Sequence, residues 1–352
     1  MNFGILGSGS WGTALAKILT DNGQSIYWWN RSESAIRQMM SRRHNPKYLS
    51  KAYFDTSKLQ LTVNPSEVIE HADCIVIAIP SAFVAETLLS LDRNIFKGKK
   101  IVSAVKGILP EQNLLLNDFL KQEFDFPLED YFTVLGPCHA EEVAAEKLSY
   151  LTFTGIQQEV THEIAAAFKT EYLNTLENTD IYGVQYAAVL KNIYAVGAGM
   201  AHGLDYGDNF LSVLIANSAD EMAVFLRKVG IKNLEVGSID HQIEHEGMIH
   251  ITTPNQTTNY AASVYLGDLL VTCYSLFSRN RSFGNMIGKG YSVQSAQLEM
   301  SMVAEGYNAS KCMFHINQSI KAEMPIAETV YRILWEGLSA EEGFSQIEKS
   351  LV

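Results

Sequence analysis

The stretch NFGILGSGSWGTALAKILTDNG, residues 2–23, decides the fold. A short apolar run comes first, and glycines follow at positions 7, 9 and 12. Apolar residues then recur at helical spacing as far as Gly23, a helix-stop signal. The order of strand, glycine turn and helix predicts the start of a βαβ unit. Its G-x-G-x-x-G spacing is typical of a dinucleotide pyrophosphate site.

Each glycine of this turn has a physical reason. Gly7 allows the tight turn, Gly9 lets the backbone approach a pyrophosphate, and Gly12 lets the helix pack closely on the strand. The helix N-terminus favours the negative charge of the phosphates. A plain strand–helix turn with no ligand is the alternative interpretation.

The first half of the chain alternates between strand-like and helical segments. Apolar, β-branched runs recur at 25–29, 72–80, 99–105, 131–136 and 148–155, with helical patterns between them, for example at 81–91 and 111–122. This alternation predicts a doubly wound, parallel α/β sheet. From residue 184 long helix-periodic segments dominate. We therefore expect a dinucleotide-binding domain at 1–183 and a mostly α-helical substrate domain at 184–352, with 232–258 as a connecting loop or an insertion.

Composition excludes several functional classes. The net charge of −12 disfavours nucleic acid as a partner but permits a small anionic substrate. The four cysteines include no CxxC pair, and His241, His245 and His250 read as loop residues, so no metal site is expected. No signal peptide and no apolar stretch of about 20 residues is recognised, so we expect a cytoplasmic protein without a membrane span.

The residues after the second predicted strand bear on cofactor choice. NAD sites place an acidic residue there, to bind the ribose hydroxyls. Here Asn30 and Arg31 stand in that position, and no acid occurs before Glu33. An arginine can hold a 2′-phosphate, so NADP is slightly favoured over NAD. A solvated surface role for Arg31 stays open.

Four further motifs carry chemistry: SAVKG (103–107), GPCHAEEVA (136–144), LKN (190–192) and SRNRSFG (278–284). The first two follow predicted strands, where ligands lie in open α/β folds. The third places a lysine in an apolar helix, and the fourth offers arginines that match phosphate geometry. Taken singly, each lysine could be a surface residue and SRNR a solvated loop. His139 and His202 are expected to be ordinary hydrogen-bonded histidines.

Taken together, these motifs resemble one family. GSGSWGTALA, KG after a strand, GPCHAEEVA, LKN, GDN (207–209), GDLLVTC (267–273), SRNRSFG, EG (305–306) and MPI (324–326) occur in the order seen in bacterial NAD(P)-dependent glycerol-3-phosphate dehydrogenases. The resemblance covers residues 4 to about 335. It implies an N-terminal Rossmann domain followed by a helical domain, a cytoplasmic enzyme and a homodimer. It also implies interconversion of dihydroxyacetone phosphate and sn-glycerol 3-phosphate, which feeds phospholipid synthesis.

The resemblance also implies roles for individual residues. Lys191 is the proton donor and acceptor. The implied substrate contacts are Lys106, Gly136, Cys138, Lys191, Asp268, Ser278, Arg279 and Asn280. The implied cofactor contacts are Gly7, Gly9, Ser10, Trp11, Gly12, Arg31, Lys106, Ala140, Arg279 and Glu305.

The proton-transfer role makes physical demands on Lys191. Burial and the cations Lys106 and Arg279 should lower its pKa, which eases proton donation. Asp268 should oppose that shift, so its expected job is to orient Lys191. Helix capping is the alternative for Asp268.

The sequence departs from the family pattern at several positions. Cys138 replaces a hydroxyl residue, and Ala187 and Ala188 replace glycines. Val264 and Tyr265 replace small residues expected beside the pocket. Phe210 and Asn217 replace a threonine and a basic residue, and the loop at 232–258 is long. These changes keep two other hypotheses open: a reductase of another small hydroxy acid, and a cofactor-binding sensor without turnover.

Overall fold

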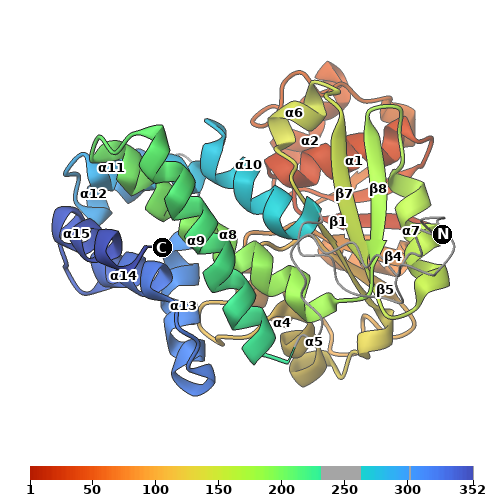
Figure 1. The fold of residues 1–352 in the computed structure, drawn as a ribbon. Helices are drawn as coiled ribbons and strands as arrows, with labels where there is room; N and C mark the ends of the chain where they lie inside the picture. Colours follow the sequence, from red (N-terminus) through yellow and green to blue (C-terminus); the bar gives the residue numbers. More distant parts are fainter. Residues whose placement is uncertain (231–262, 301–302, 352) are drawn as a thin grey trace, which may run out of the picture.

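The computed structural model describes residues 1–230, 263–300 and 303–351. It has two halves (Figure 1). The N-terminal half is a sheet with helices on both faces, and the C-terminal half consists of helices. Residues 232–258, predicted to be a loop or an insertion, lie outside the described residues.

A single eight-stranded sheet organises the N-terminal half. Its strands are β1 (Phe3–Leu6), β2 (Ile26–Trp29), β3 (Leu59–Thr62), β4 (Cys74–Ile77), β5 (Lys100–Ser103), β6 (Tyr131–Leu135), β7 (Ser149–Thr154) and β8 (Leu173–Asn178). Their spatial order is β3-β2-β1-β4-β5-β6-β7-β8. The described pairs are parallel except β6 with β7, which is antiparallel.

The strands are apolar on both faces, so each face buries its own core. Along β4, Cys74 and Val76 join one hydrophobic cluster, and Ile75 and Ile77 join the other. This is the period-two alternation of a strand covered on both sides. The first cluster is covered by α1 (Ser10–Asp21), α2 (Glu33–Arg42), α6 (Ala140–Ala144) and α7 (Gln158–Phe168). The second is covered by α3 (Pro65–His71), α4 (Ser81–Leu89) and α5 (Leu116–Phe124).

The predicted doubly wound sheet is confirmed, with three corrections. Strands β3 and β8 were missed, because their sequences LQLT and LNTLEN carry polar, partly exposed residues at the two sheet edges. Residues 148–155 form a strand, but β7 runs antiparallel to β6. Helix α5 begins at Leu116 rather than 111, because an isolated bridge between Leu109 and Leu114 holds the preceding segment.

The helical half is built around the buried helix α8 (Ile181–Gly203). Its other helices are α9 (Asp208–Lys228), α10 (Asp268–Tyr274), α11 (Arg279–Gly288), α12 (Val293–Glu299), α13 (Glu305–Ile320), α14 (Pro325–Trp335) and α15 (Ala340–Ser350). A π-helical turn, η3 (Ser263–Gly267), leads into α10. Two 3-10 turns, η1 (Thr56–Lys58) and η2 (Leu128–Asp130), complete the described helices.

One described helix, α9, is long and apolar enough to cross a membrane by length and composition alone. From the sequence no apolar stretch of that length is expected, so α9 is a correction. Half of its most apolar window is buried inside the protein, where α9 packs on α8, α10 and α14. This burial is that of a core helix.

Candidate active site

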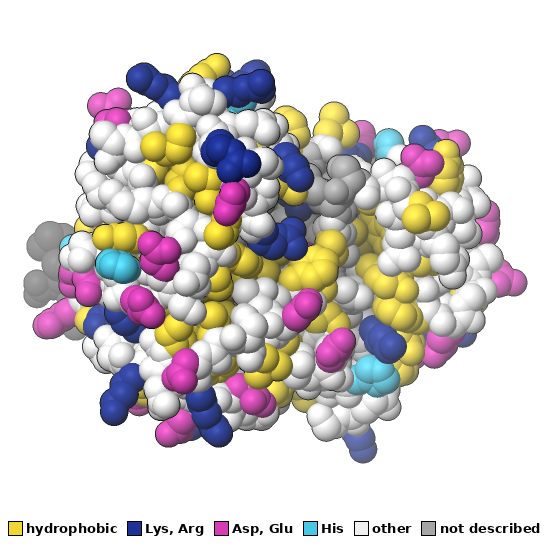
Figure 2. All heavy atoms as spheres, turned by 180° about the vertical axis from the view of Figure 1, so that it is seen from behind, with side chains coloured by type: hydrophobic (Ala, Val, Ile, Leu, Met, Phe, Trp, Pro, Cys, Tyr) yellow, Lys and Arg dark blue, Asp and Glu magenta, His cyan; other side chains and the backbone are white. Residues whose placement is uncertain are grey.

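A cavity of about 410 Å³ lies where the two halves meet. Its sheet side is formed by residues just after β1, β4, β5 and β6, and its other side by residues of α8, α10, α11 and α13. The strand order reverses between β1 and β4, and ligands of open α/β sheets bind beyond the carboxyl ends of the strands at such a point. Seen from behind, basic and hydrophobic side chains gather along the hollow between the halves (Figure 2).

The three glycines of the first turn have three different environments. Gly7 has φ +124°, and a Cβ there would lie 2.4 Å from the carbonyl oxygen of Ala78. A Cβ on Gly12 would lie 2.2 Å from the carbonyl oxygen of Gly7. Gly9, in contrast, lines the cavity and would meet nothing within 4 Å. The turn therefore needs Gly7 and Gly12 for packing, while Gly9 leaves open backbone toward the cavity.

Two side chains hold this turn in place. Trp28 Nε1 donates to the carbonyl oxygen of Gly7 at 2.9 Å. Asn45 Nδ2 donates to the carbonyl oxygen of Ser8 at 3.0 Å and to Thr13 Oγ1 at 2.8 Å. Because these contacts come from β2 and from the segment after α2, the turn is rigid before any ligand arrives.

Lys191 on α8 lines the cavity and is only 3% exposed. Its Nζ forms an ion pair with Oδ1 of Asp268, the first residue of α10. Burial lowers the pKa of Lys191 to about 8; the Asp268 charge opposes the shift, and Lys106 adds to it. The predicted direction is confirmed. The N-cap of α10 is Gly267, and Asp268 follows it as the acidic residue of the first turn, so Asp268 does not occupy the cap position itself.

A chain of amide hydrogen bonds surrounds the lysine. Asn192 Nδ2 donates to the carbonyl oxygen of Lys106 at 2.8 Å, and Asn192 Oδ1 accepts from Asn280 Nδ2 at 2.8 Å. Asn280 Oδ1 in turn accepts from the backbone N–H of Gly306 at 2.9 Å. This relay ties α8 to the loop after β5, to α11 and to α13. Because both the amide nitrogen and the amide oxygen of Asn280 take part in this relay, its first role is to hold the cavity wall.

Glycines explain why LKN and SRNR come together. A Cβ on Gly199 of α8 would lie 2.0 Å from the carbonyl oxygen of Arg281, and one on Gly284 of α11 would lie 2.0 Å from that of Val196. Gly203 and Gly288, one turn further along each helix, are equally crowded by the opposite backbone. The two helices therefore touch backbone to backbone. This contact brings the start of α11, with Ser278, Arg279 and Asn280, beside Lys191.

Lys106 lies on the sheet side of the cavity. Its Nζ is 4.8 Å from the ring centroid of Trp11, a cation–π contact, and 3.5 Å from the carbonyl oxygen of Gly136. Cys138 does not offer its thiol to the cavity, because Sγ donates to the carbonyl oxygen of Tyr150 at 3.1 Å. Burial raises the pKa of that thiol to about 11, so it stays protonated.

Glu305, the first residue of α13, forms part of the cavity wall. Its Oε2 accepts from Ser81 Oγ at 2.5 Å and its Oε1 from the Ser81 backbone N–H at 3.1 Å. Burial raises the pKa of Glu305, while the Ser81 hydrogen bonds and the charge of Arg279 oppose that shift. Gly107 leaves room for this contact, since a Cβ there would lie 2.7 Å from Ser81 Oγ.

Most of the residues predicted from the sequence line this one cavity. They are Gly7, Gly9, Ser10, Trp11, Arg31, Lys106, Cys138, Ala140, Lys191, Asp268, Ser278, Arg279, Asn280 and Glu305. Gly12 and Gly136 lie behind the lining, where they shape the turns. Ser278 also caps α11, because its hydroxyl accepts from the Arg281 backbone N–H at 3.3 Å.

Other lining residues were not predicted as site residues: Tyr48, His139, Asn192 and Val303. Asn192 stands in the LKN motif, so its amide beside a buried lysine was a usable signal. Burial lowers the pKa of His139, and Nε2 of that side chain is buried without a partner among the described residues. The expectation of an ordinary hydrogen-bonded histidine is therefore wrong at that nitrogen. Tyr48 and Val303 gave no sequence signal.

Several departures from the family pattern lie away from the cavity. Val264 and Tyr265 are buried in the π-helical turn that leads into α10 and do not line the cavity. Phe210 packs on Tyr206, with ring centroids 4.2 Å apart. Ala187 and Ala188, which replace glycines of the family pattern, are buried in the core around α8.

The residues present fit a dinucleotide. Gly9 leaves open space where any other residue would place a side chain, and Arg31 lines the cavity beyond the end of β2. Asn30 Nδ2 and Trp11 Nε1 are buried without partners among the described residues, so both donors are unused. The described ranges contain no cluster of three metal-ligating side chains, and His241, His245 and His250 lie outside those ranges.

A glycine turn that opens onto the same cavity as a buried lysine–aspartate pair defines a nicotinamide-dependent dehydrogenase. Residues 2–161 match the family model for the NAD-dependent glycerol-3-phosphate dehydrogenase N-terminus, and residues 180–345 match the model for its C-terminus. The chain belongs to the NAD-dependent glycerol-3-phosphate dehydrogenase family.

Individual relatives agree with this assignment. The chain is 32% identical to glycerol-3-phosphate dehydrogenase [NAD(P)+] of Bacillus subtilis, over 96% of this chain and 91% of the relative. It is 33% identical to that of Agathobacter rectalis, over 98% and 94%. The crystal structure of the Coxiella burnetii glycerol-3-phosphate dehydrogenase superposes with a TM-score of 0.84 at 25% identity, covering 98% of both chains.

Proposed function

We propose that this chain is an NAD(P)-dependent sn-glycerol-3-phosphate dehydrogenase. It interconverts dihydroxyacetone phosphate and glycerol 3-phosphate, a precursor of phospholipids. The observation that carries this proposal is the buried Lys191–Asp268 pair, which faces the same cavity as the glycine turn and Arg279. A proton donor, a cofactor turn and a phosphate-binding cation are the three parts that this reaction needs.

The glycine turn is suited to hold the pyrophosphate. Gly7, Gly9 and Gly12 shape the turn, and the N-terminus of α1 with Ser10 and Trp11 offers donors to anionic oxygens. Arg31 binds the adenosine ribose end of the cofactor. Ala140, Glu305, Lys106 and Arg279 border the nicotinamide end. The bound nicotinamide supplies or accepts the hydride.

Lys191 provides the proton. The carbonyl oxygen of dihydroxyacetone phosphate gains negative charge as the carbon is reduced, and an ammonium group beside it stabilises that charge and then donates. A pKa of about 8 keeps Lys191 largely protonated at neutral pH and makes it a better acid than an exposed lysine. Asp268 orients the ammonium. Lys106 adds positive charge on the opposite side of the cavity.

The remaining substrate contacts are assigned by chemistry. Arg279 binds the phosphate through its guanidinium fork. Asn280 and Ser278 shape the phosphate pocket through the start of α11, and the backbone at Gly136 and Cys138 borders the rest of the substrate. The thiol of Cys138 contributes packing rather than a hydrogen bond, since Tyr150 already accepts its proton.

The wider setting follows from the same proposal. Residues 1–183 form the dinucleotide-binding domain and residues 184–352 the helical substrate domain. The enzyme acts in the cytoplasm as a homodimer, with neither nucleic acid nor a membrane as a partner.

Steady-state oxidation of NADH or NADPH with dihydroxyacetone phosphate tests this function. We expect turnover by the wild type and none detectable for Lys191→Ala with the cofactor still bound. Lys17→Ala is the matched control, because Lys17 is also a buried, acid-paired lysine but lies outside the cavity. A wild type that binds cofactor without turnover contradicts the proposal and favours the sensor hypothesis. Turnover with an unphosphorylated hydroxy acid instead favours the other reductase.

Cofactor preference is tested by Arg31→Asp. The exposed guanidinium at the end of β2 is placed to attract a 2′-phosphate. We expect the reversed charge to raise the KM for NADPH about tenfold or more while changing the KM for NADH much less. Equal effects on both KM values would show that Arg31 does not distinguish the two cofactors.

A further inference from the structure

The turn that delivers Asp268 to Lys191 has an unusual backbone. Residues Ser263–Gly267 form a π-helical turn (η3), and Asp268 follows at once as the first residue of α10. π-Helical turns are rare and occur frequently at functional sites. The direction of the Asp268 carboxylate depends on how firmly this turn is held.

Tyr265 is the residue that anchors the turn. Its side chain is 1% exposed, and its hydroxyl donates to Asp180 Oδ2 at 2.7 Å. Asn178 Nδ2 adds a longer contact of 3.4 Å to the same hydroxyl. A side-chain contact between Ser263 Oγ and Thr152 Oγ1 is also 3.4 Å. Of these three contacts, the Tyr265–Asp180 bond is the shortest.

The partner of Tyr265 belongs to the helix that carries Lys191. Asp180 is the N-cap of α8, where its Oδ1 accepts from the backbone N–H of Gly183 at 2.9 Å. Lys191 lies on the same helix, about 16 Å further along at 1.5 Å per residue. The Asp180 carboxylate thus caps α8, which carries Lys191, and anchors the π-helical turn η3, which precedes Asp268.

We propose that Tyr265 is a positioning residue for proton transfer, whose hydroxyl fixes the π-helical turn to the N-cap of α8 and so holds Asp268 against Lys191. This inference rests on the proposed function of Lys191. Tyr265 replaces a small side chain of the family pattern. The Tyr265–Asp180 hydrogen bond is therefore a feature of this chain and not of the family motif around Asp268.

Loss of the hydroxyl has a directional consequence. A looser turn lengthens the mean distance between the Asp268 carboxylate and the Lys191 ammonium. The Asp268 charge then opposes the fall in the pKa of Lys191 less strongly, so that pKa falls further. The other charged or titratable groups that act on Lys191 or share its surroundings are Lys106, Cys138, His139 and Cys273. Burial keeps both thiols protonated, and Lys106 pushes the pKa down.

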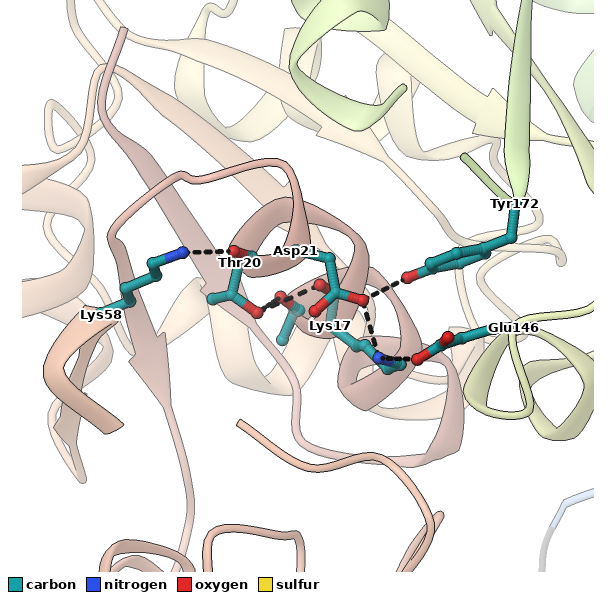
Figure 3. Close-up of polar contacts among 7 residues, drawn as sticks. Lys17, Thr20, Asp21, Lys58, Glu146 and Tyr172 are labelled. Atoms are coloured by element: carbon teal, nitrogen blue, oxygen red, sulfur yellow. Dashed lines mark hydrogen bonds and ion pairs between the residues drawn. The ribbon is translucent and has the colours of Figure 1, made fainter. Parts of the chain in front are cut away.

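Tyr265→Phe tests the proposal, because it keeps the buried ring and removes only the hydroxyl. Tyr172→Phe is the matched control, since the Tyr172 hydroxyl also donates to an aspartate, Asp21 Oδ2 at 2.6 Å, in a cluster outside the cavity (Figure 3). We measure kcat and KM for dihydroxyacetone phosphate from pH 6 to 10, together with the free energy of unfolding.

We expect Tyr265→Phe to lower kcat roughly tenfold, since a misplacement of about 1 Å can cost about 100-fold. The alkaline fall of kcat should move to lower pH, while Tyr172→Phe changes only the free energy of unfolding. Asp180→Asn should give the same pH shift, and the double variant Tyr265→Phe/Asp180→Asn should be no worse than either alone. An unchanged pH profile in Tyr265→Phe overturns the proposal, as do additive losses in the double variant. Inactivity of the wild type would instead refute the proposed function.

Discussion

Two buried lysines of this molecule differ in what surrounds them. Lys17 lies on α1 and pairs with Asp21 at 2.7 Å and Glu146 at 2.9 Å (Figure 3). Lys191 lies on α8, and Asp268 is its one ion-pair partner among the residues that the structure describes, with Lys106 close enough to act on it. The pKa of Lys17 is raised although burial lowers it, because two carboxylates outweigh the burial, whereas the pKa of Lys191 is lowered to about 8.

The difference shows how one residue type serves two purposes. Lys17 ties α1 to the end of α6 through charges that are partly open to solvent, since the Glu146 side chain is 60% exposed. Lys191 is nearly fully buried where it lines the cavity, and the Asp268 charge does not outweigh the effect of burial on its pKa. The first arrangement is suited to stability and the second to proton transfer.

The largest expected effect separates the two lysines by activity. Lys191→Met should lower kcat by about 10²–10⁴-fold, the usual contribution of a positioned acid, while Lys17→Met should leave kcat within about twofold. Steady-state assays of both variants under saturating dihydroxyacetone phosphate measure this. A comparable loss of kcat in Lys17→Met would contradict the assignment of a structural role to Lys17 and a catalytic role to Lys191.

The second effect concerns the helix contact that places Lys191. Gly284→Ala should cost more than about 3 kcal/mol of unfolding free energy, because its Cβ would lie 2.0 Å from the Val196 carbonyl oxygen and neither backbone can retreat cheaply. Gly207→Ala is the control, since its Cβ would meet nothing within 4 Å. Urea unfolding compares the two. Equal stability of both variants would show that α8 and α11 can separate without cost.

A third buried charge, Glu221 on α9, extends the comparison to an acid without a cation. Its carboxylate accepts from the backbone N–H groups of Ile326 and Ala327, yet burial raises its pKa to about 7. The folded state therefore binds more protons than the unfolded state between about pH 4.5 and 7, and stability falls as the pH rises through that window.

Glu221→Gln should abolish that fall, which we expect to be about 3 kcal/mol, and should keep one acceptor for α14. The measurement is the unfolding free energy of wild type and variant from pH 4.5 to 8. Parallel curves would mean that Glu221 stays ionised throughout.

The smallest effect is the opposite pH response of the two lysines. Stabilisation by Lys17 is complete below pH 10.5 and is lost as the pH rises through its higher folded-state value, so the cost of Lys17→Met, about 1 kcal/mol, should shrink in alkali. For Lys191 the unfolded state binds more protons between about pH 8 and 10.5, so this lysine makes the protein more stable as the pH rises there. Unfolding of both Met variants between pH 7.5 and 11 checks the signs. Curves that move in the same direction would contradict the contrast.

Much of this site could be predicted from the sequence because its parts lie in short motifs. The glycine turn, Lys106 and the start of α11 each sit at the end of a recognisable element, where polar side chains among apolar runs give a clear signal. Strands β3 and β8 were missed because edge strands bury too little to need an apolar run. Asn192 and Tyr265 were not assigned their contacts because their partners come from other elements, such as Asn280 and Asp180.

The class of the protein can be predicted from the order of residues alone: a strand, a glycine turn and a helix at the N-terminus, then helices that carry the lysine and the arginine motif. These features are local, so the spacing of residues is enough to show them. The ionisation of Lys191 depends on the three-dimensional fold, because burial and the charges of Asp268 and Lys106, residues far from it along the chain, set its pKa. The fold likewise decides that Cys138 turns its thiol to Tyr150 and that Tyr265 anchors the turn before Asp268.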